Sequence, residues 1–211
     1  MLTCKIISSK EIGDIHDASL NILRKIGIKV NHNEVFDILG DAGAVVDKKT
    51  KIVKFPEDMV TEGIQKAGKK HILQGRNPYS VAKFGYEDQL FLSSGGQYLW
   101  IDETTGKRRP GTLEDTKAAI LVGDALKEIN IVGAFILTAE IPSKVRDIHL
   151  YAELIKYTGK PCFAWINNGK SAKYIIEMFK VVVGGEVKLR NKPMTEAFIE
   201  PISPLQLSKE G

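Results

Sequence analysis

The sequence predicts a mixed α/β protein built around a parallel sheet, and three observations lead to this fold class. From about residue 90 onward, apolar runs of strand length alternate with helical patterns, as in βα units. These runs recur at roughly thirty-residue intervals, the usual length of a βαβ unit. The run 131–137 is apolar almost throughout, as expected for a strand that is buried on both faces. Pattern alone does not choose between a barrel and a doubly wound sheet, because both begin with the same unit.

Residues 1–89 have a different pattern, which predicts a small N-terminal cap region of helices and short strands. Ser8 to Glu11 is typical of a capping box that opens a helix, and Gly27 is typical of its end. This helix carries an apolar stripe that we expect to be packed: Ile12, Ile15, Ile22, Leu23 and Ile26. A second helix is expected to begin at 31–34, and a third at Pro56 after a strand at 51–55.

Residues 90–211 are expected to hold the first βα units of the main domain. Strand-like segments in 89–101 precede a turn at 102–106, and Thr112 to Asp115 is typical of a helix start. Further strands are expected at 131–137, 162–166 and 197–199. The helices between them are predicted from two apolar stripes. The second spans 174–182, and its helix ends at Gly184 and Gly185. The first helix ends at Gly159, Arg146 and Asp147 are expected to pair on its surface, and its stripe contains Val145, Ile148, His149, Ala152 and Ile155.

Composition excludes several classes of protein. The chain has 211 residues, 43% of them hydrophobic, and a formal net charge of +4 carried by scattered lysines. Its short basic clusters lie between periodic segments without interleaved aromatic residues, so we do not expect nucleic-acid binding. No apolar run approaches the ~20 residues of a membrane span, and the first residues lack a secretory pattern, so we expect a cytoplasmic protein without membrane contact.

Cysteine and histidine spacing predicts no metal site in this chain. Cys4 and Cys162 are too far apart to form a redox or metal motif, and two cysteines make no disulfide framework. The four histidines show no ligand spacing with these cysteines: His16, His32, His71 and His149.

Several stretches carry a family resemblance because they occur in a fixed order. The early stretches are 15–23 and Ala42-Gly43-Ala44, and the middle ones are Gly95-Gly96, 102–109 and 112–115. The late ones are Arg146-Asp147-Ile148-His149, Lys160-Pro161 and Pro201-Ile202-Ser203-Pro204-Leu205-Gln206. With these, the chain from Lys10 to its last residue resembles the N-terminal half of the trimethylamine methyltransferase family. Ser93-Ser94 stands where we expect a Gly-Pro type of turn.

The resemblance implies a TIM-type, eight-stranded α/β barrel, of which this chain supplies about half the strands. It also implies methyl transfer from trimethylamine or a betaine to the reduced cobalt of a corrinoid. That corrinoid is carried by a separate partner protein, and no cofactor is bound permanently by this chain. Methanogenesis from methylamines and bacterial demethylation of betaines are the processes implied. Some members carry pyrrolysine, in the half that lies beyond this chain, so the substrate class stays open. We also expect a homo-oligomer.

The candidate substrate residues are Gly95, Gly96, Glu140, Trp165 and Glu200. Barrel enzymes place reacting groups at the C-terminal ends of the strands, and the two glutamates and Trp165 follow predicted strands there. Carboxylates and aromatic faces attract a methylated ammonium, so they predict a cation pocket. The alternatives are surface loops for the glutamates, core packing for Trp165, and a tight turn for the glycine pair. The catalytic residues are not identified.

Two other functions remain open at this stage. The chain could be a non-catalytic fragment or binding module of the same fold, with an open sheet edge. It could also be a phosphate- or nucleotide-binding protein, although no phosphate-loop or dinucleotide fingerprint follows a strand. We expect the isolated chain to be inactive as a methyltransferase, because half a barrel leaves its pocket open to water.

Overall fold

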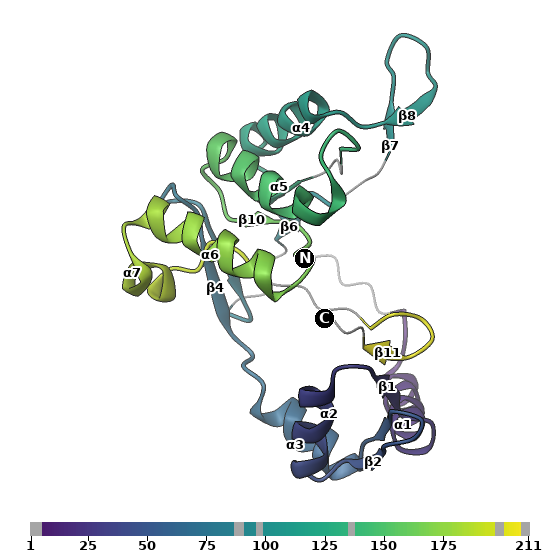
Figure 1. Cartoon of the computed structure of the whole chain (residues 1–211). Coiled ribbons are helices and arrows are strands. Elements are labelled where there is room, and N and C mark those ends of the chain that lie inside the picture. Colours follow the sequence, from purple (N-terminus) through teal and green to yellow (C-terminus); the bar gives the residue numbers. More distant parts are fainter. Residues whose placement is uncertain (1–5, 87–90, 96–98, 135–137, 197–200, 208–211) are drawn as a thin grey trace. The chain divides into compact units, whose positions relative to one another are not determined.

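The computed structural model of the protein describes residues 6–86, 91–95, 99–134, 138–196 and 201–207 (Figure 1). Contacts divide the chain into two compact units: unit 1 comprises 1–67 and 199–211, and unit 2 comprises 68–198. The expected change of pattern between residues 89 and 90 therefore falls inside unit 2. Helices and strands are mixed in both units, which confirms the α/β class, and none of the sheets in the described parts is closed.

In its described residues, unit 1 is a small four-stranded sheet with three helices. Its elements are α1 (Ser9–Lys25), β1 (Ile28–Val30), α2 (Asn33–Asp41), β2 (Val45–Asp47), β3 (Ile52–Lys54), α3 (Glu57–Lys66) and β11 (Gln206–Leu207). The strand order is β11-β1-β3-β2, in which only β11 runs parallel to its neighbour. The last described segment of the chain thus pairs with one of the first strands.

The helix α1 begins as the sequence predicts but is not packed as predicted. Ser8 and Glu11 form the capping box, and Gly27 has a φ of +77°. Of the α1 residues, only Leu20 is buried, whereas Ile12 and Ile15 are 53% and 59% exposed. The expected packing of the isoleucine stripe is therefore wrong within the described structure. The reason is that the core of this unit is built by the sheet and α2, through Val30, Phe36, Ala44 and Val53.

Unit 2 contains a parallel sheet and two hairpins. Its elements are β4 (His71–Gln74), β5 (Val81–Phe84), β6 (Leu92–Ser93), β7 (Leu99–Ile101), β8 (Arg108–Pro110), α4 (Leu113–Ala125), β9 (Ile129–Gly133), α5 (Ser143–Tyr157), β10 (Cys162–Phe163), α6 (Gly169–Val183) and α7 (Glu186–Asn191). The pairs β4–β5 and β7–β8 are antiparallel. The strands β6, β9 and β10 pair in parallel, and a bridge from Cys162 to Thr195 adds a fourth parallel segment.

The two faces of this parallel sheet are covered differently. On one face, Val132, Cys162 and Ala164 pack with residues of α4, α5 and α6, which lie together in Figure 1. On the other face, Ile131 packs with Leu73 and Ala82 of the β4–β5 hairpin. Alternate residues of the strands therefore point to the helices and to the hairpin, as the pleat of a strand requires.

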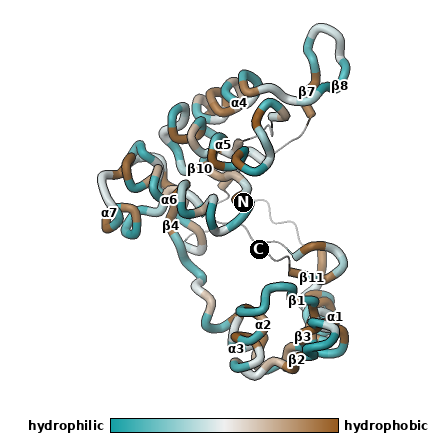
Figure 2. The backbone as a smooth tube through the Cα atoms, viewed as in Figure 1, coloured by the Kyte–Doolittle hydropathy of each residue, from teal (hydrophilic) through white to brown (hydrophobic). Residues whose placement is uncertain are grey.

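The buried side of α5 differs from the predicted stripe. Leu150, Tyr151 and Leu154 are buried, and Asp147 lies on the same side, one turn earlier. His149, which the predicted stripe includes, is exposed. The error has a simple cause: the apolar residues of α5 occupy a wide arc of the helix, so more than one phase fits the pattern. Figure 2 shows apolar residues spread along α4.

Strands β6 and β9 approach each other closely because Gly133 has no side chain. A Cβ atom on Gly133 would lie 1.9 Å from the carbonyl oxygen of Ser94. The hydroxyl of Ser94 accepts a hydrogen bond of 2.7 Å from the Gly133 N–H, and the Ser94 N–H donates to Ile131. The serine that replaces the expected Gly-Pro turn is thus buried and bonded to the neighbouring strand.

Candidate active site at the carboxyl end of the parallel sheet

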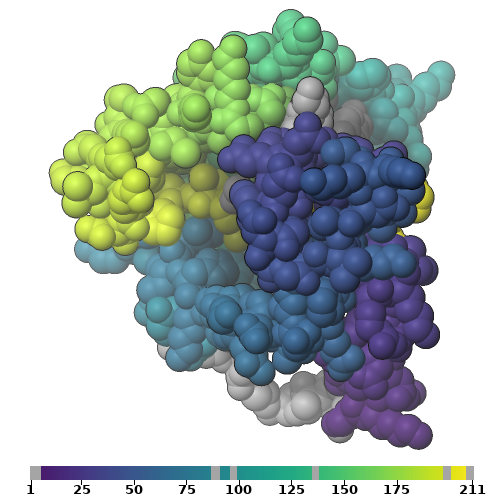
Figure 3. All heavy atoms as spheres, turned by 60° about the horizontal axis from the view of Figure 1, so that its bottom comes forward, coloured from purple at the N-terminus to yellow at the C-terminus, as the bar shows by residue number. Residues whose placement is uncertain are grey.

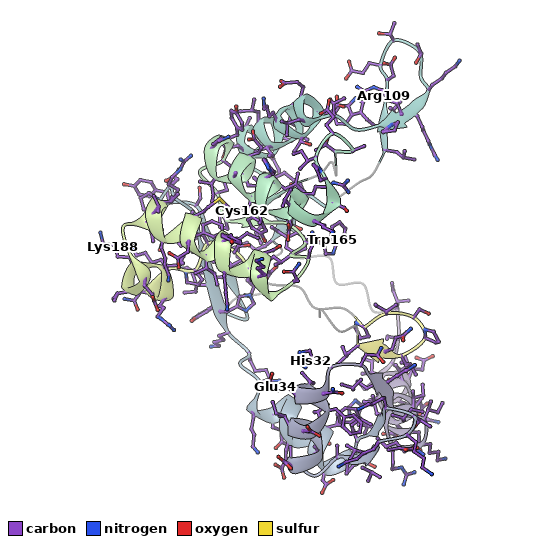
Figure 4. The ribbon with its side chains drawn as sticks, viewed as in Figure 1. His32, Glu34, Arg109, Cys162, Trp165 and Lys188 are labelled. Atoms are coloured by element: carbon purple, nitrogen blue, oxygen red, sulfur yellow. The ribbon has the colours of Figure 1, made fainter. Side chains whose placement is uncertain are left out.

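Trp165 lies at the carboxyl end of β10 and is 37% exposed. Its ring centroid is 6.5 Å from that of Phe163, which packs on the hairpin side of the sheet. In Figure 4, Cys162 lies within unit 2 whereas Trp165 lies at its margin. A half-exposed indole at a strand end can stack against a ligand, which a core tryptophan cannot do.

Glu140 follows β9, as expected, but its carboxylate holds a helix end. Its Oε2 atom accepts hydrogen bonds from the N–H of Leu113 at 2.6 Å and from the hydroxyl of Thr138 at 3.2 Å. Leu113 is the first residue of α4, where backbone N–H groups lack partners within the helix. Glu140 therefore links the β9 exit to the start of α4, and its side chain is not free to be a simple counter-charge.

Of the remaining predicted substrate residues, the structure describes Gly95 but not Gly96 or Glu200. Gly95 is exposed, and a Cβ atom built on it would meet no atom within 4 Å. The structure therefore gives no packing reason for a glycine at this position. Gly96 and Glu200 lie outside the described residues.

A carboxylate that sequence reasoning missed, Glu196, lies on the hairpin side of the sheet. Thr195 points to the helices, since its hydroxyl lies 3.0 Å from the Tyr151 hydroxyl. The next residue, Glu196, points to the opposite side, where its Oε2 is 3.7 Å from Nε2 of His71. Both side chains are partly exposed, at 39% for Glu196 and 52% for His71. The sequence signal for Glu196 is weak, because it is one polar residue ahead of a short apolar run.

His71 extends this face with an aromatic surface. Its ring stacks on Phe84 with centroids 4.4 Å apart and an interplanar angle of 11°. Phe84 in turn contacts Phe91 at 5.5 Å. Together with Phe163 and Trp165, these rings make the hairpin side of the sheet strongly aromatic, and Glu196 supplies a negative charge there.

Polar side chains from α5 hold the β10 exit in place. The hydroxyl of Tyr151 donates to the carbonyl of Ala164 at 2.9 Å and accepts from its N–H at 3.2 Å. The buried carboxylate of Asp147 accepts a 2.8 Å hydrogen bond from the N–H of Asn167. These bonds fix the backbone on both sides of Trp165. The expected surface pairing of Asp147 with Arg146 is wrong, since Asp147 is turned inward.

The Tyr151 phenol and the Cys162 thiol of this sheet region stay protonated at neutral pH. Burial raises the pKa of the Tyr151 phenol to about 12, with smaller opposing effects from its hydrogen bonds. Burial also raises the pKa of the Cys162 thiol to about 12, so this cysteine is not a nucleophile at neutral pH. Among the described residues, no group of three or more His, Cys, Asp or Glu side chains could hold a metal ion.

The described helices also include none that is long and apolar enough to cross a membrane.

Comparisons with known proteins confirm the family resemblance. A sequence model of the trimethylamine methyltransferase family (MTTB) matches residues 1–210. A trimethylamine methyltransferase of Desulfitobacterium hafniense is 32% identical over 200 residues, which cover 95% of this chain and 40% of that protein. A glycine betaine methyltransferase from a second strain of Desulfitobacterium hafniense is 26% identical over 203 residues, covering 95% and 42%.

A trimethylamine methyltransferase of Methanosarcina barkeri is 29% identical over 216 residues, covering 96% of this chain and 42% of that protein. The chain thus spans about two fifths of the length of these curated relatives.

Proposed function

Because the chain belongs to the trimethylamine methyltransferase family, we propose that it forms the amine-binding part of a methyltransferase for trimethylamine or a betaine. The observation that carries the proposal is the match of nearly the whole chain, residues 1–210, to that family. The relatives include enzymes named for trimethylamine and for glycine betaine, so the proposal covers both amines.

We propose that unit 2 is the first part of an α/β barrel. The support is the strand order: β6, β9, β10 and the segment at Thr195 are neighbours in the order of the chain, all parallel. In a doubly wound sheet the strand order reverses at a switch point, whereas in a barrel successive strands continue in one direction. Four parallel segments would be half of an eight-stranded barrel.

The aromatic and acidic side chains suggest how a methylated amine would be held. The indole of Trp165 offers a π-face, and the carboxylate of Glu196 lies on the same side of the sheet as the Phe163 ring. A cation over such a face gains ~0.5–2 kcal/mol, the larger value when water is excluded. We therefore assign amine binding to Trp165 and Glu196, and helix capping to Glu140.

The methyl acceptor in this proposal is the reduced cobalt of a corrinoid on a separate protein, which acts as a second substrate. The carbon–nitrogen bond breaks, its electron pair stays on nitrogen, and cobalt provides the pair for the new bond to carbon. The task of this chain is to position the amine and remove water from it, which lowers the barrier to an in-line displacement. A homo-oligomer with a corrinoid-protein partner, in the cytoplasm, is part of the same proposal.

The proposal is tested by methyl transfer in two preparations. The 211-residue chain alone, mixed with cob(I)alamin and either amine, is expected to give no methylcobalamin spectrum. A fusion that joins this chain to the part of the Desulfitobacterium hafniense relative that it does not cover is expected to give one. A folded fusion that transfers methyl groups from neither amine would contradict the function and favour a non-catalytic module.

The site assignment has its own variants in that fusion. Trp165→Ala is expected to raise the Michaelis constant for the amine several-fold, consistent with the loss of one cation–π contact. Trp100→Phe is the control, because Trp100 lies in β7, where it lines a pocket with residues of α4. An unchanged Michaelis constant for Trp165→Ala would return Trp165 to a packing role.

A further inference from the structure

The amino end of the same parallel sheet has a pocket that the proposed methyl transfer does not use. It has a volume of about 510 Å³ and lies between the segment after β4, the end of α6, and α7. The Gln74 N–H donates to the carbonyl of Pro193 at 2.9 Å, just ahead of the fourth parallel segment, so the pocket is at the start of the strands. Figure 3 shows side chains of α6 and α7 on the surface of the molecule.

Three cations line this pocket, and no carboxylate does: Arg76, Lys188 and Lys192. Lys188 and Lys192 make no ion pair with any residue that the structure describes. The contrast with their neighbours is clear, because Lys180 and Arg190 both pair with Glu186, at 3.1 Å and 2.8 Å. Carboxylates are therefore available on this surface but do not neutralise the pocket.

Arg76 is fixed in its place by the backbone. Its Nη2 atom donates to the carbonyl of Thr158 at 3.1 Å. The loop that carries it is anchored at Gly75, whose missing Cβ atom would lie 2.2 Å from the carbonyl oxygen of Gly159. A guanidinium held in this way is pre-organised for an anion, since less conformational freedom is lost on binding.

The rest of the lining fits an organic group attached to the anion. Val182, Val183 and Met194 form an apolar wall, and the amides of Gln74 and Asn191 offer polar contacts. The volume is within the range of roughly 300–1,000 Å³ that is usual for small-molecule sites. Three cations in the lining of one pocket suit the negative charge of a phosphate monoester, whose oxygens accept several charge-assisted hydrogen bonds at once.

We propose that this pocket binds a small organic phosphate through Arg76, Lys188 and Lys192. It lies at the opposite end of the sheet from Trp165, and in Figure 4 Lys188 and Trp165 lie on opposite margins of unit 2. A ligand here would not compete with the amine. The pocket is therefore a second site, independent of whether the methyl-transfer proposal holds.

The test is calorimetric titration of the full 211-residue chain with phenyl phosphate, whose ring can contact the apolar wall. We expect saturable binding that is tighter than binding of inorganic phosphate, and no binding of phenol. Lys188→Gln with Lys192→Gln should weaken the affinity for phenyl phosphate about tenfold or more, because two charge-assisted contacts are lost. Lys170→Gln with Lys173→Gln makes the same change in net charge at the start of α6 and should alter affinity less than about twofold.

A second measurement needs no variant. Phenyl phosphate should protect Lys188 and Lys192 of the unaltered chain from acetylation, measured by peptide mass spectrometry, while Lys170 and Lys173 react as before. Absence of saturable binding, equal weakening in both double variants, or equal protection of all four lysines would each overturn the proposal. Any of these results would favour lysines that only interact with helix C-terminal ends, Lys188 with that of α6 and Lys192 with that of α7.

Discussion

The two ends of the parallel sheet in unit 2 differ in how far their glycine turns are enclosed. At the amino end, the buried Gly75 packs directly on the Gly159–Lys160 peptide, and the Lys160 ammonium donates to the carbonyls of Gly123, Leu126 and Ile129. At the carboxyl end, side chains of α5 and of the segment after β9 form hydrogen bonds with backbone groups: Tyr151, Asp147 and Glu140. Side-chain bonds therefore support both ends, but Gly75 is enclosed by neighbouring backbone whereas Gly95 and Trp165 are exposed to solvent. The carboxyl end is thus the end at which a ligand can reach an aromatic ring.

Replacing one glycine at each end should give the largest difference in the free energy of unfolding between the two ends. Gly75→Ala is expected to lower the free energy of unfolding by about 3 kcal/mol or more, since its Cβ atom would overlap the Gly159 carbonyl and the Lys160 backbone. Gly95→Ala, the control at the other end, has open space and should stay within about 0.5 kcal/mol. Urea unfolding measures both, and equal effects would remove the distinction between the ends.

The fold class and the helix starts could be predicted because their causes are local. The capping boxes at Ser8 and Thr112 are present, and Gly184 ends α6 in the left-handed region with a φ of +79°. Long apolar runs correctly placed β9 and β10, although β9 begins two residues earlier and β10 is shorter than predicted, and residues 135–137 of the first run lie outside the described residues. The predicted strand at 197–199 lies outside the described residues.

The pairing of distant segments could not be predicted, because it depends on tertiary contacts. Strand β11 pairs with β1 although all of unit 2 lies between them in the sequence. The β4–β5 hairpin covers one face of the parallel sheet through Leu73 and Ala82. Glu196 gains its place from the bridge at Thr195, and Asp147 from the phase of α5. No periodicity in the sequence specifies such partners.

Removing the Tyr151 hydroxyl tests the side-chain support of the carboxyl end. Tyr151→Phe should cost about 2 kcal/mol, because the buried N–H and carbonyl of Ala164 lose their partner. Tyr174→Phe is the control, since Tyr174 is 54% exposed on α6. Thermal unfolding of the two variants compares them, and a Tyr151→Phe protein as stable as its control would mean that the hydroxyl does not support this end.

Removing the carboxylate of Asp147 should lower the free energy of unfolding by a similar or somewhat smaller amount. The structural change should be confined to the segment around Trp165. Asp147→Ala is expected to cost about 1.5 kcal/mol through the lost hydrogen bond to Asn167. It should also shift the emission of Trp165 to longer wavelength as the loop loosens. Asp147→Asn keeps an acceptor and should restore most of the wild-type emission. A normal emission maximum in Asp147→Ala would show that Trp165 is positioned by other contacts.

Acid should weaken the junction where the β7–β8 hairpin meets α4. Two hydrogen bonds from Arg109, at 2.6 Å and 3.0 Å, hold the pKa of Asp115 well below its usual value of 3.8. A carboxylate with a lowered pKa in the folded state stabilises the fold above its unfolded pKa, and this contribution is lost as the pH falls below that value. Because the Arg109 side chain is 36% exposed, we expect about 1 kcal/mol, lost below about pH 4.

Asp115→Asn should remove this part of the pH dependence while lowering stability at neutral pH. Stability measured by urea unfolding from pH 7 to pH 3 compares the two proteins. Parallel curves for the two proteins would show that the Arg109 pair does not contribute.

The most direct test of amine binding at the carboxyl end of the sheet is titration of Trp165 fluorescence with tetramethylammonium in a chain that carries Trp100→Phe. Trp165 is then the single indole, because the sequence has two tryptophans. We predict a saturable change in emission that ammonium does not produce and that Glu196→Gln weakens about fivefold, as for one lost charge contact. The same response to both cations, or no effect of Glu196→Gln, would contradict a methylated-amine site at the carboxyl end of the sheet.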